Sequence, residues 1–186
     1  LARQARLAAG DTDVDSADFA EVIIGQVVPA GSGQAVPRQI SLPIGIPDQV
    51  GGLHINKACG SSLKAVMLSA GLIRAGEGEL YLAGGVESMT NAPFMDRQGR
   101  QGHKYGHFEM IDSIMWDGLY DHVKGMIMGE AAEFIAEQYG ITRAAMDEFA
   151  CRSHQKAAEA TQAGRFKDEI APIEIPGRKG QVTVID

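Results

Sequence analysis

Residues 55–65 read INKACGSSLKA, and this stretch decides the fold of the chain around it. It consists of a strand end, a turn of small residues and the start of a helix. The apolar residues after the turn recur at the three- and four-residue spacing of a helix: Leu63, Val66, Met67, Ala70 and Ile73. Gly60, Ser61 and Ser62 form the turn-and-cap region, so the free N–H groups and the partial positive charge of the helix start face Cys59.

Cys59 has two interpretations at this position. A helix start favours the thiolate, which is the nucleophilic form of cysteine, and this predicts a reactive residue. The alternative is a small cysteine packed under the helix, because most free cysteines in proteins are buried. The spacing by itself does not separate the two.

The flanking segments predict a parallel α/β layer. Glu21–Val28 is a β-branched run bounded by turns, and Leu53–Asn56 leads into the turn at Cys59, so both are predicted strands. A short helix is expected after Pro37, and a further strand is expected to run into the glycines at 84–85. The order strand–helix–strand–helix–strand favours a largely parallel sheet covered by helices.

Two segments resemble the thiolases. Residues 56–65 (NKACGSSLKA) are similar to the nucleophile segment of these enzymes, and residues 83–90 (AGGVESMT) are similar to their second signature. Two long motifs in this order and at this spacing are more specific than a lone Cys-Gly pair. Thiolases form or cleave 3-ketoacyl-CoA through an acyl-cysteine, so the resemblance implies that Cys59 carries the acyl group. A ketoacyl synthase is the competing enzyme class, and residues 56–57 and 84–89 favour a thiolase over it.

The resemblance covers essentially the whole chain and corresponds to the N-terminal half of a thiolase with part of its loop domain. It implies an α/β fold: an incomplete, layered α/β/α half with an inserted, mostly helical and irregular loop domain. We expect residues 1–92 to form the thiolase N-terminal domain without its first strand. We expect residues 93–186 to form an incomplete loop domain that carries an oligomerisation hairpin.

Three segments of the second half acquire roles through the same resemblance. Residues 103–112 (HKYGHFEMID) resemble the tetramerisation hairpin of biosynthetic-type thiolases, which implies a homo-oligomer, either a dimer or a tetramer. Leu119 and Met128 match positions that border the pantetheine and acyl pocket in thiolases. Ile127 stands where short-chain biosynthetic enzymes have histidine, and this difference leaves room for longer or branched acyl groups.

No metal and no resident cofactor is expected, because coenzyme A enters as a thioester substrate. His103 and His107 are four residues apart, but Gly106 interrupts any helix there and the spacing matches no recognised ligand pattern. Among the other segments, residues 1–9 and Arg143–Ala163 are predicted helices, the second with Thr142 as its N-cap. Residues 166–173 are predicted to begin a strand, and residues 182–185 are predicted to form the last strand.

The thiolase mechanism also needs a histidine and a second cysteine, which the family supplies from Gly-His-Pro and Cys-Gly segments in its C-terminal half. Neither segment occurs in these 186 residues, and we assign neither role to His54 or Cys151. Three alternatives stay open: an incomplete record of a thiolase, one half of a split enzyme whose partner chain brings the missing half, or a CoA-binding or oligomerisation protein without catalysis.

Composition sets the outer limits. The net charge is −7 with no basic block, so neither nucleic acid nor an anionic membrane is an expected partner. No apolar run has the length that a membrane span needs, and no secretory signal is visible. Two cysteines suit a reducing compartment better than a disulfide scaffold. Composition therefore favours a cytoplasmic protein, and the resemblance to thiolases implies an enzyme of fatty acid metabolism with acyl-CoA as its small-molecule partner.

Overall fold

The structure is a computed structural model that describes residues 14–177 and 180–184. The chain divides into two compact units, residues 1–128 and 129–186. The predicted boundary between residues 92 and 93 separates two domains of the thiolase family, and it stays a prediction. The helix predicted at residues 1–9 lies outside the described residues.

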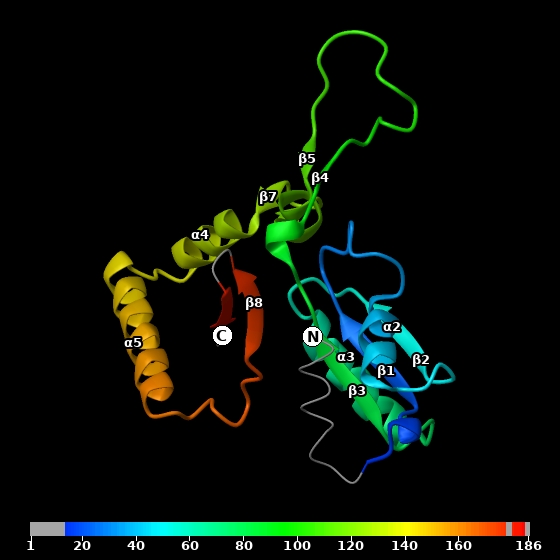
Figure 1. Ribbon diagram of the computed structural model, residues 1–186. Coiled ribbons are helices and arrows are strands. Elements are labelled where there is room, and N and C mark those ends of the chain that lie inside the picture. The colour runs from blue at the N-terminus through cyan, green and yellow to red at the C-terminus, as the bar shows by residue number, and fades with distance from the viewer. Residues whose placement is uncertain (1–13, 178–179, 185–186) are drawn as a thin grey trace. The chain divides into compact units, whose positions relative to one another are not determined.

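A three-stranded parallel sheet forms the centre of the first unit (Figure 1). Its strands are β1 (Glu21–Gly25), β2 (Gly51–Ile55) and β3 (Tyr81–Gly85), and β1 lies between the other two. The register aligns the three strands so that Gly25, Ile55 and Gly85 all lie at the carboxyl edge. The predicted α/β class is confirmed, although β1 ends at Gly25, three residues before the predicted end of this strand.

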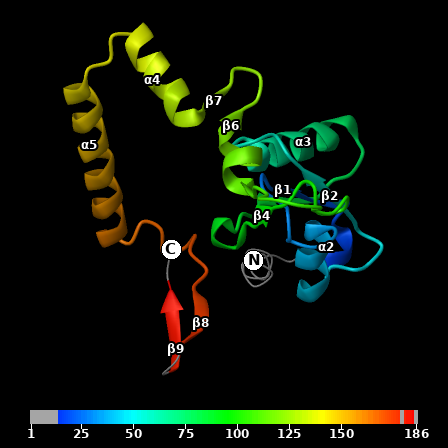
Figure 2. The same ribbon diagram turned by 90° about the horizontal axis from the view of Figure 1, so that it is seen from above.

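Helices cover the two faces of this sheet, as Figure 2 shows. On one face, α2 (Val36–Ser41) and the 3₁₀ turn η2 (Leu42–Ile44) adjoin a core to which β1 contributes Val22 and Ile24. On the other face, α3 (Ser61–Ala75) follows the turn at Cys59, as predicted. Alternate residues of β1 therefore point to opposite layers, which is the geometry of a strand buried on both sides.

The outer face of α3 carries apolar side chains that the described residues leave uncovered. The predicted helical repeat is confirmed, but Leu63 is 67% exposed, Val66 51%, Met67 55% and Ile73 45%. A contiguous apolar surface of this kind on a helix marks an interaction site more often than a free surface.

The remainder of the first unit consists of short elements. The 3₁₀ turns are η1 (Ser16–Asp18) and η3 (Met89–Asn91), and the π-helix is η4 (Ile114–Leu119). Antiparallel pairs are formed by β4 (Phe94–Met95) with β5 (Ile111–Asp112), and by β6 (Tyr120–Asp121) with β7 (Met126–Ile127). Residues 96–110 extend from the first of these pairs as a long loop (Figure 1).

The second unit contains most of α4 (Met128–Gln138), all of α5 (Arg143–Gln162), and an antiparallel pair of strands, β8 (Ile173–Gly177) and β9 (Gly180–Val184). Thr142 is the N-cap of α5, as predicted, since its Oγ1 accepts a hydrogen bond from the Ala145 N–H at 3.2 Å. The strand predicted to start at Phe166 starts at Ile173, because turns occupy residues 163–169. Ile185, the last residue of the final predicted strand, lies outside the described residues.

No helix in the described part of the chain is both long enough and apolar enough to cross a membrane.

Candidate active site

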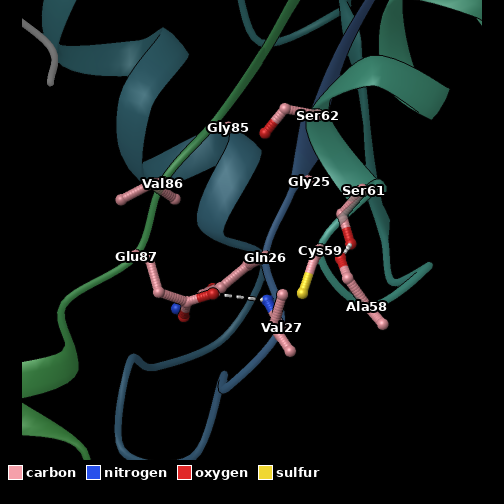
Figure 3. A pocket seen from close by; sticks show the side chains of 10 residues that line it. All are labelled: Gly25, Gln26, Val27, Ala58, Cys59, Ser61, Ser62, Gly85, Val86 and Glu87. Atoms are coloured by element: carbon pink, nitrogen blue, oxygen red, sulfur yellow. Dashed lines mark hydrogen bonds between the residues drawn. The ribbon is translucent and has the colours of Figure 1, made fainter. Parts of the chain in front are cut away.

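A pocket of about 330 Å³ lies at the carboxyl ends of β1, β2 and β3 (Figure 3). The residues that line it come from the last positions of β1 and β3, from the segments that follow the three strands and from the start of α3: Gly25, Gln26, Val27, Ala58, Cys59, Ser61, Ser62, Gly85, Val86 and Glu87. Ligands of open parallel sheets bind at this edge, because the strand ends leave a crevice there that variable segments can line.

Two glycines let the start of α3 approach the sheet closely. A Cβ at Gly25 would lie 2.5 Å from the Ser61 carbonyl carbon and 2.6 Å from the Ser62 nitrogen. A Cβ at Gly85 would overlap the Ser62 hydroxyl. Both positions therefore need glycine for space rather than for backbone flexibility. The close approach sets the N-terminus of α3 directly at the pocket.

The cysteine turn, residues 56–60, has an unusual backbone that side chains hold in place. Ala58 has a φ of +46°, in the left-handed region, which costs a non-glycine residue about 1–2 kcal/mol. Its N–H donates to Asn56 Oδ1 at 2.9 Å. The buried Ser61 hydroxyl donates to the Ala58 carbonyl at 2.6 Å and accepts from the Lys57 N–H at 2.8 Å. These bonds offset the strain of the turn.

Cys59 lies on this turn, two residues before α3 begins, and its side chain lines the pocket. Cys59 is exposed, so the alternative of a small cysteine buried under the helix does not describe this structure. The unpaired N–H groups at the start of a helix favour an anion in the first turn. The exposed thiol next to a helix start makes Cys59 a candidate nucleophile.

Glu87 is a site residue that sequence reasoning missed. Its carboxylate accepts a hydrogen bond from the Val27 N–H at 2.8 Å, which Figure 3 shows, and a second one from the Val28 N–H at 3.1 Å. These two hydrogen bonds connect the segment after β3 with the segment after β1. The 83–90 signature contains Glu87, but no local pattern shows that its carboxylate binds a backbone nearly sixty residues earlier.

Leu119 and Met128 do not line the pocket, but the structure brings them close together. Tyr120 pairs with Ile127 in the β6–β7 ladder, so Leu119 and Met128 are the next residues beyond that pair. The neighbouring Gly118 lies against the pocket wall, since a Cβ there would be 3.5 Å from Val28 Cγ2 and 3.8 Å from Val27 Cγ1. The resemblance to thiolases implies that both residues border the substrate pocket, and that role stays a prediction.

Other residues considered from the sequence lie elsewhere. His54 is in register with Ile24, whose side chain belongs to the α2 layer, so His54 lies on the face opposite α3. Cys151 is exposed on α5 in the second unit. Within residues 14–177 and 180–184, no group of three or more His, Cys, Asp or Glu side chains could hold a metal ion.

The loop at residues 96–110 contains a hydrogen bond between a histidine and an aspartate. His103 Nε2 lies 2.6 Å from Asp96 Oδ2, and the His103 ring stacks on Phe108 with ring centroids 4.3 Å apart. The hydrogen bond from His103, followed by that from the Gln98 N–H, lowers the pKa of the Asp96 carboxyl below its ordinary value. The predicted oligomer contact of residues 103–112 is untested by a single chain.

Comparison with known proteins gives relatives along almost the entire chain. The acetyl-CoA acetyltransferase of Pseudomonas aeruginosa is 46% identical over 170 residues, which are 91% of this chain and 43% of that protein. The acetyl-CoA acetyltransferase of Cupriavidus necator is 49% identical over 160 residues, which are 86% of this chain and 41% of that protein. The chain thus spans less than half the length of these relatives.

Solved structures agree with this fold. The crystal structure of the Bacillus anthracis acetyl-CoA acetyltransferase matches with a TM-score of 0.91 and 35% identity, covering 100% of this chain and 48% of that one. The Acat5 thiolase from Ascaris suum, in complex with coenzyme A, matches with a TM-score of 0.86 and 36% identity, covering 91% of this chain and 44% of that one. The family model "Thiolase, N-terminal domain" matches residues 2–186, and the chain therefore belongs to the thiolase family.

Proposed function

We propose that this chain is the nucleophile-bearing part of a thiolase, an acyl-CoA C-acyltransferase that forms or cleaves 3-ketoacyl-CoA through an acyl group on Cys59. The observation that carries the proposal is the placement of the exposed Cys59 thiol in the pocket, at the start of α3. A helix start stabilises the thiolate that the reaction needs.

In the acyl-transfer step, the Cys59 thiolate attacks the thioester carbonyl carbon of an acyl-CoA. The electron pair on sulfur forms the new carbon–sulfur bond, and the carbonyl oxygen becomes an oxyanion. Collapse of this intermediate breaks the bond to the CoA sulfur, which leaves as a thiolate and takes up a proton. The backbone N–H of Cys59 supplies one donor to the oxyanion in this proposal.

The complete reaction needs groups from outside these residues. By resemblance, a histidine activates the thiol and a second cysteine acts as acid and base at the substrate carbon. We propose that further chain, either of the same polypeptide or of a partner, supplies both. Two observations agree: the chain spans less than half of its relatives, and the outer face of α3 is apolar and exposed.

Substrate contacts and assembly belong to the same proposal. Leu119 and Met128 border the pantetheine and acyl pocket, which is supported by the place of the neighbouring Gly118, where a Cβ would lie 3.8 Å from Cγ1 of the pocket residue Val27. A homo-oligomer, a dimer or a tetramer, would use the loop at residues 103–112. A cytoplasmic location rests on the two cysteines, which suit a reducing compartment.

The test is the intact mass of the protein after incubation with acetyl-CoA, followed by peptide mapping. We expect one acetyl group on Cys59, none on Cys59→Ala, and an unchanged adduct on the matched control Cys151→Ala. An unmodified Cys59 in a sample whose mass shows only this chain would contradict acyl transfer by this chain on its own. An unmodified Cys59 in a sample that also contains the missing half would contradict the nucleophile assignment. That result would favour the second candidate function, a CoA-binding or oligomerisation protein without catalysis.

A further inference from the structure

The hydrogen bonds around the pocket form one continuous path from β3 to the cysteine turn. Glu87 accepts from the Val27 and Val28 N–H groups, at 2.8 and 3.1 Å. The Val27 carbonyl accepts from Asn56 Nδ2 at 2.9 Å, and Asn56 Oδ1 accepts from the Ala58 N–H at 2.9 Å. The path links the segments after all three strands and ends at the residue directly before the nucleophile.

At the end of this path, the strained backbone of Ala58 needs hydrogen bonds to hold it in place. The left-handed backbone of Ala58 persists only because surrounding bonds over-determine it. The bond from the Ala58 N–H depends on the orientation of the Asn56 side chain, which its second bond to the Val27 carbonyl keeps in place. If the Val27 carbonyl moves, Asn56 is free to rotate and the turn can relax.

At the start of the path, the Glu87 carboxylate holds the backbone of Val27 and Val28. Val28 is buried, so its N–H needs a partner, and a carboxylate is a stronger acceptor than a neutral oxygen. Glu87 accepts from two successive N–H groups, which fixes both the position and the tilt of the Val27 peptide. Cys59, Val27 and Glu87 line the same pocket, as Figure 3 shows.

We propose that Glu87 is a positioning residue for Cys59: through Val27 and Asn56 it holds the cysteine turn, and thereby keeps the thiol at the start of α3. The proposal rests on the proposed function, in which Cys59 is the nucleophile. It assigns Glu87 no contact with the substrate.

Positioning and simple charge effects predict opposite results. Removing the negative charge of Glu87 would favour the Cys59 thiolate and raise its reactivity, if charge alone mattered. Loosening the turn would move the thiol away from the helix start, disfavour the thiolate and lower its reactivity. Glu87→Asp separates the two, because it keeps the charge but is too short to hold both N–H groups in the same geometry.

The experiment measures the rate of alkylation of Cys59 by iodoacetamide between about pH 6 and pH 9, with peptide mass spectrometry to resolve the two cysteines. Cys151, exposed on α5, is the internal reference in every sample. The variants are Glu87→Gln, Glu87→Asp and Asn56→Ala. The matched control is Glu77→Gln, which removes an exposed carboxylate just beyond the C-terminal end of α3. Thermal melts by circular dichroism identify any variant that no longer folds.

We expect all three variants to slow Cys59 alkylation by about two- to fivefold at neutral pH relative to Cys151, and to move its pH profile upward. Glu77→Gln should leave both unchanged. The double variant Glu87→Gln with Asn56→Ala should be no slower than the slower single variant, because both act on one path. If Glu87→Gln does not fold, Asn56→Ala and Glu87→Asp still test whether disrupting the path slows the alkylation of Cys59.

Three results would overturn the proposal: an unchanged Cys59 rate in Glu87→Asp, a faster rate in Glu87→Gln, or additive effects in the double variant. Failure of the proposed function is a separate outcome. Wild-type Cys59 that takes no acetyl group from acetyl-CoA, in a sample that also contains the missing half, contradicts the nucleophile assignment, whereas the alkylation profile still reports whether Glu87 positions the thiol.

Discussion

The cysteine turn and the helices of the second unit are built in different ways. At the turn, three strand ends, a buried serine and two close-packed glycines converge on a few residues. In the second unit, α5 runs for 20 residues without a buried side chain, and Phe134 and Phe149 are 61% and 66% exposed. Tertiary contacts therefore decide the first conformation, whereas capping and helix propensity decide the second.

The largest effect is expected from adding a methyl group where α3 meets the sheet. Gly25→Ala places a Cβ 2.5 Å from the Ser61 carbonyl carbon, so backbone must move on both sides of the pocket. Overpacking of this kind costs about 3 kcal/mol of unfolding free energy. Urea denaturation measures this loss, and Cys59 alkylation reports the accompanying change in the site.

Gly71→Ala is the matched control for that substitution. Gly71 lies within α3, and a Cβ there meets nothing within 4 Å. Because glycine is a poorer helix former than alanine, this variant should gain about 0.5–1 kcal/mol. Equal effects of the two substitutions would show that close packing does not govern the turn.

A smaller and purely local effect is expected in the second unit. Thr142→Ala removes the side-chain oxygen that accepts from the Ala145 N–H, and the loss of such an N-cap costs about 1 kcal/mol. Hydrogen exchange should accelerate in the first turn of α5, while Cys59 alkylation stays at its wild-type rate. Thr161→Ala, in the last turn of α5, is the control and should leave the first turn protected. A change at Cys59 in Thr142→Ala would contradict the independence of the two regions.

The smallest effect concerns the loop at residues 96–110, which is also held by local contacts. The pKa of Asp96 is lowered, chiefly by its hydrogen bond with His103, so the ionised carboxyl favours the ordered loop. This contribution is present above the ordinary aspartate pKa and is lost as the pH falls through the lowered value.

Nuclear magnetic resonance of the Gln98 amide, which donates to Asp96 at 2.9 Å, follows this loss directly. Asp96→Asn should abolish the acidic transition of that amide, and His107→Asn, in the same loop, should keep it. An unchanged transition in Asp96→Asn would assign it to another group.

The sequence by itself determined the elements whose signals are local. The β-branched run at 21–28, the small-residue turn before Ser61 and the Thr142 cap each act within a few residues. The turn and the cap are confirmed, and the predicted strand is confirmed over residues 21–25. The family also followed from the sequence, since two long motifs match in order. The start of the strand after Phe166 was wrong, because its first residues form turns that no strong local signal marks.

Only the tertiary structure decided how the pocket is held. Glu87 and Val27 are far apart in sequence, and a hydrogen bond between them exists only once β1 and β3 pair in register. The need for glycine at Gly25 and Gly85 likewise arises from the close approach of α3, not from any turn that a sequence pattern marks. Local patterns determine which element a residue joins, whereas long-range pairing determines which atoms meet, and the geometry around Cys59 depends on the second.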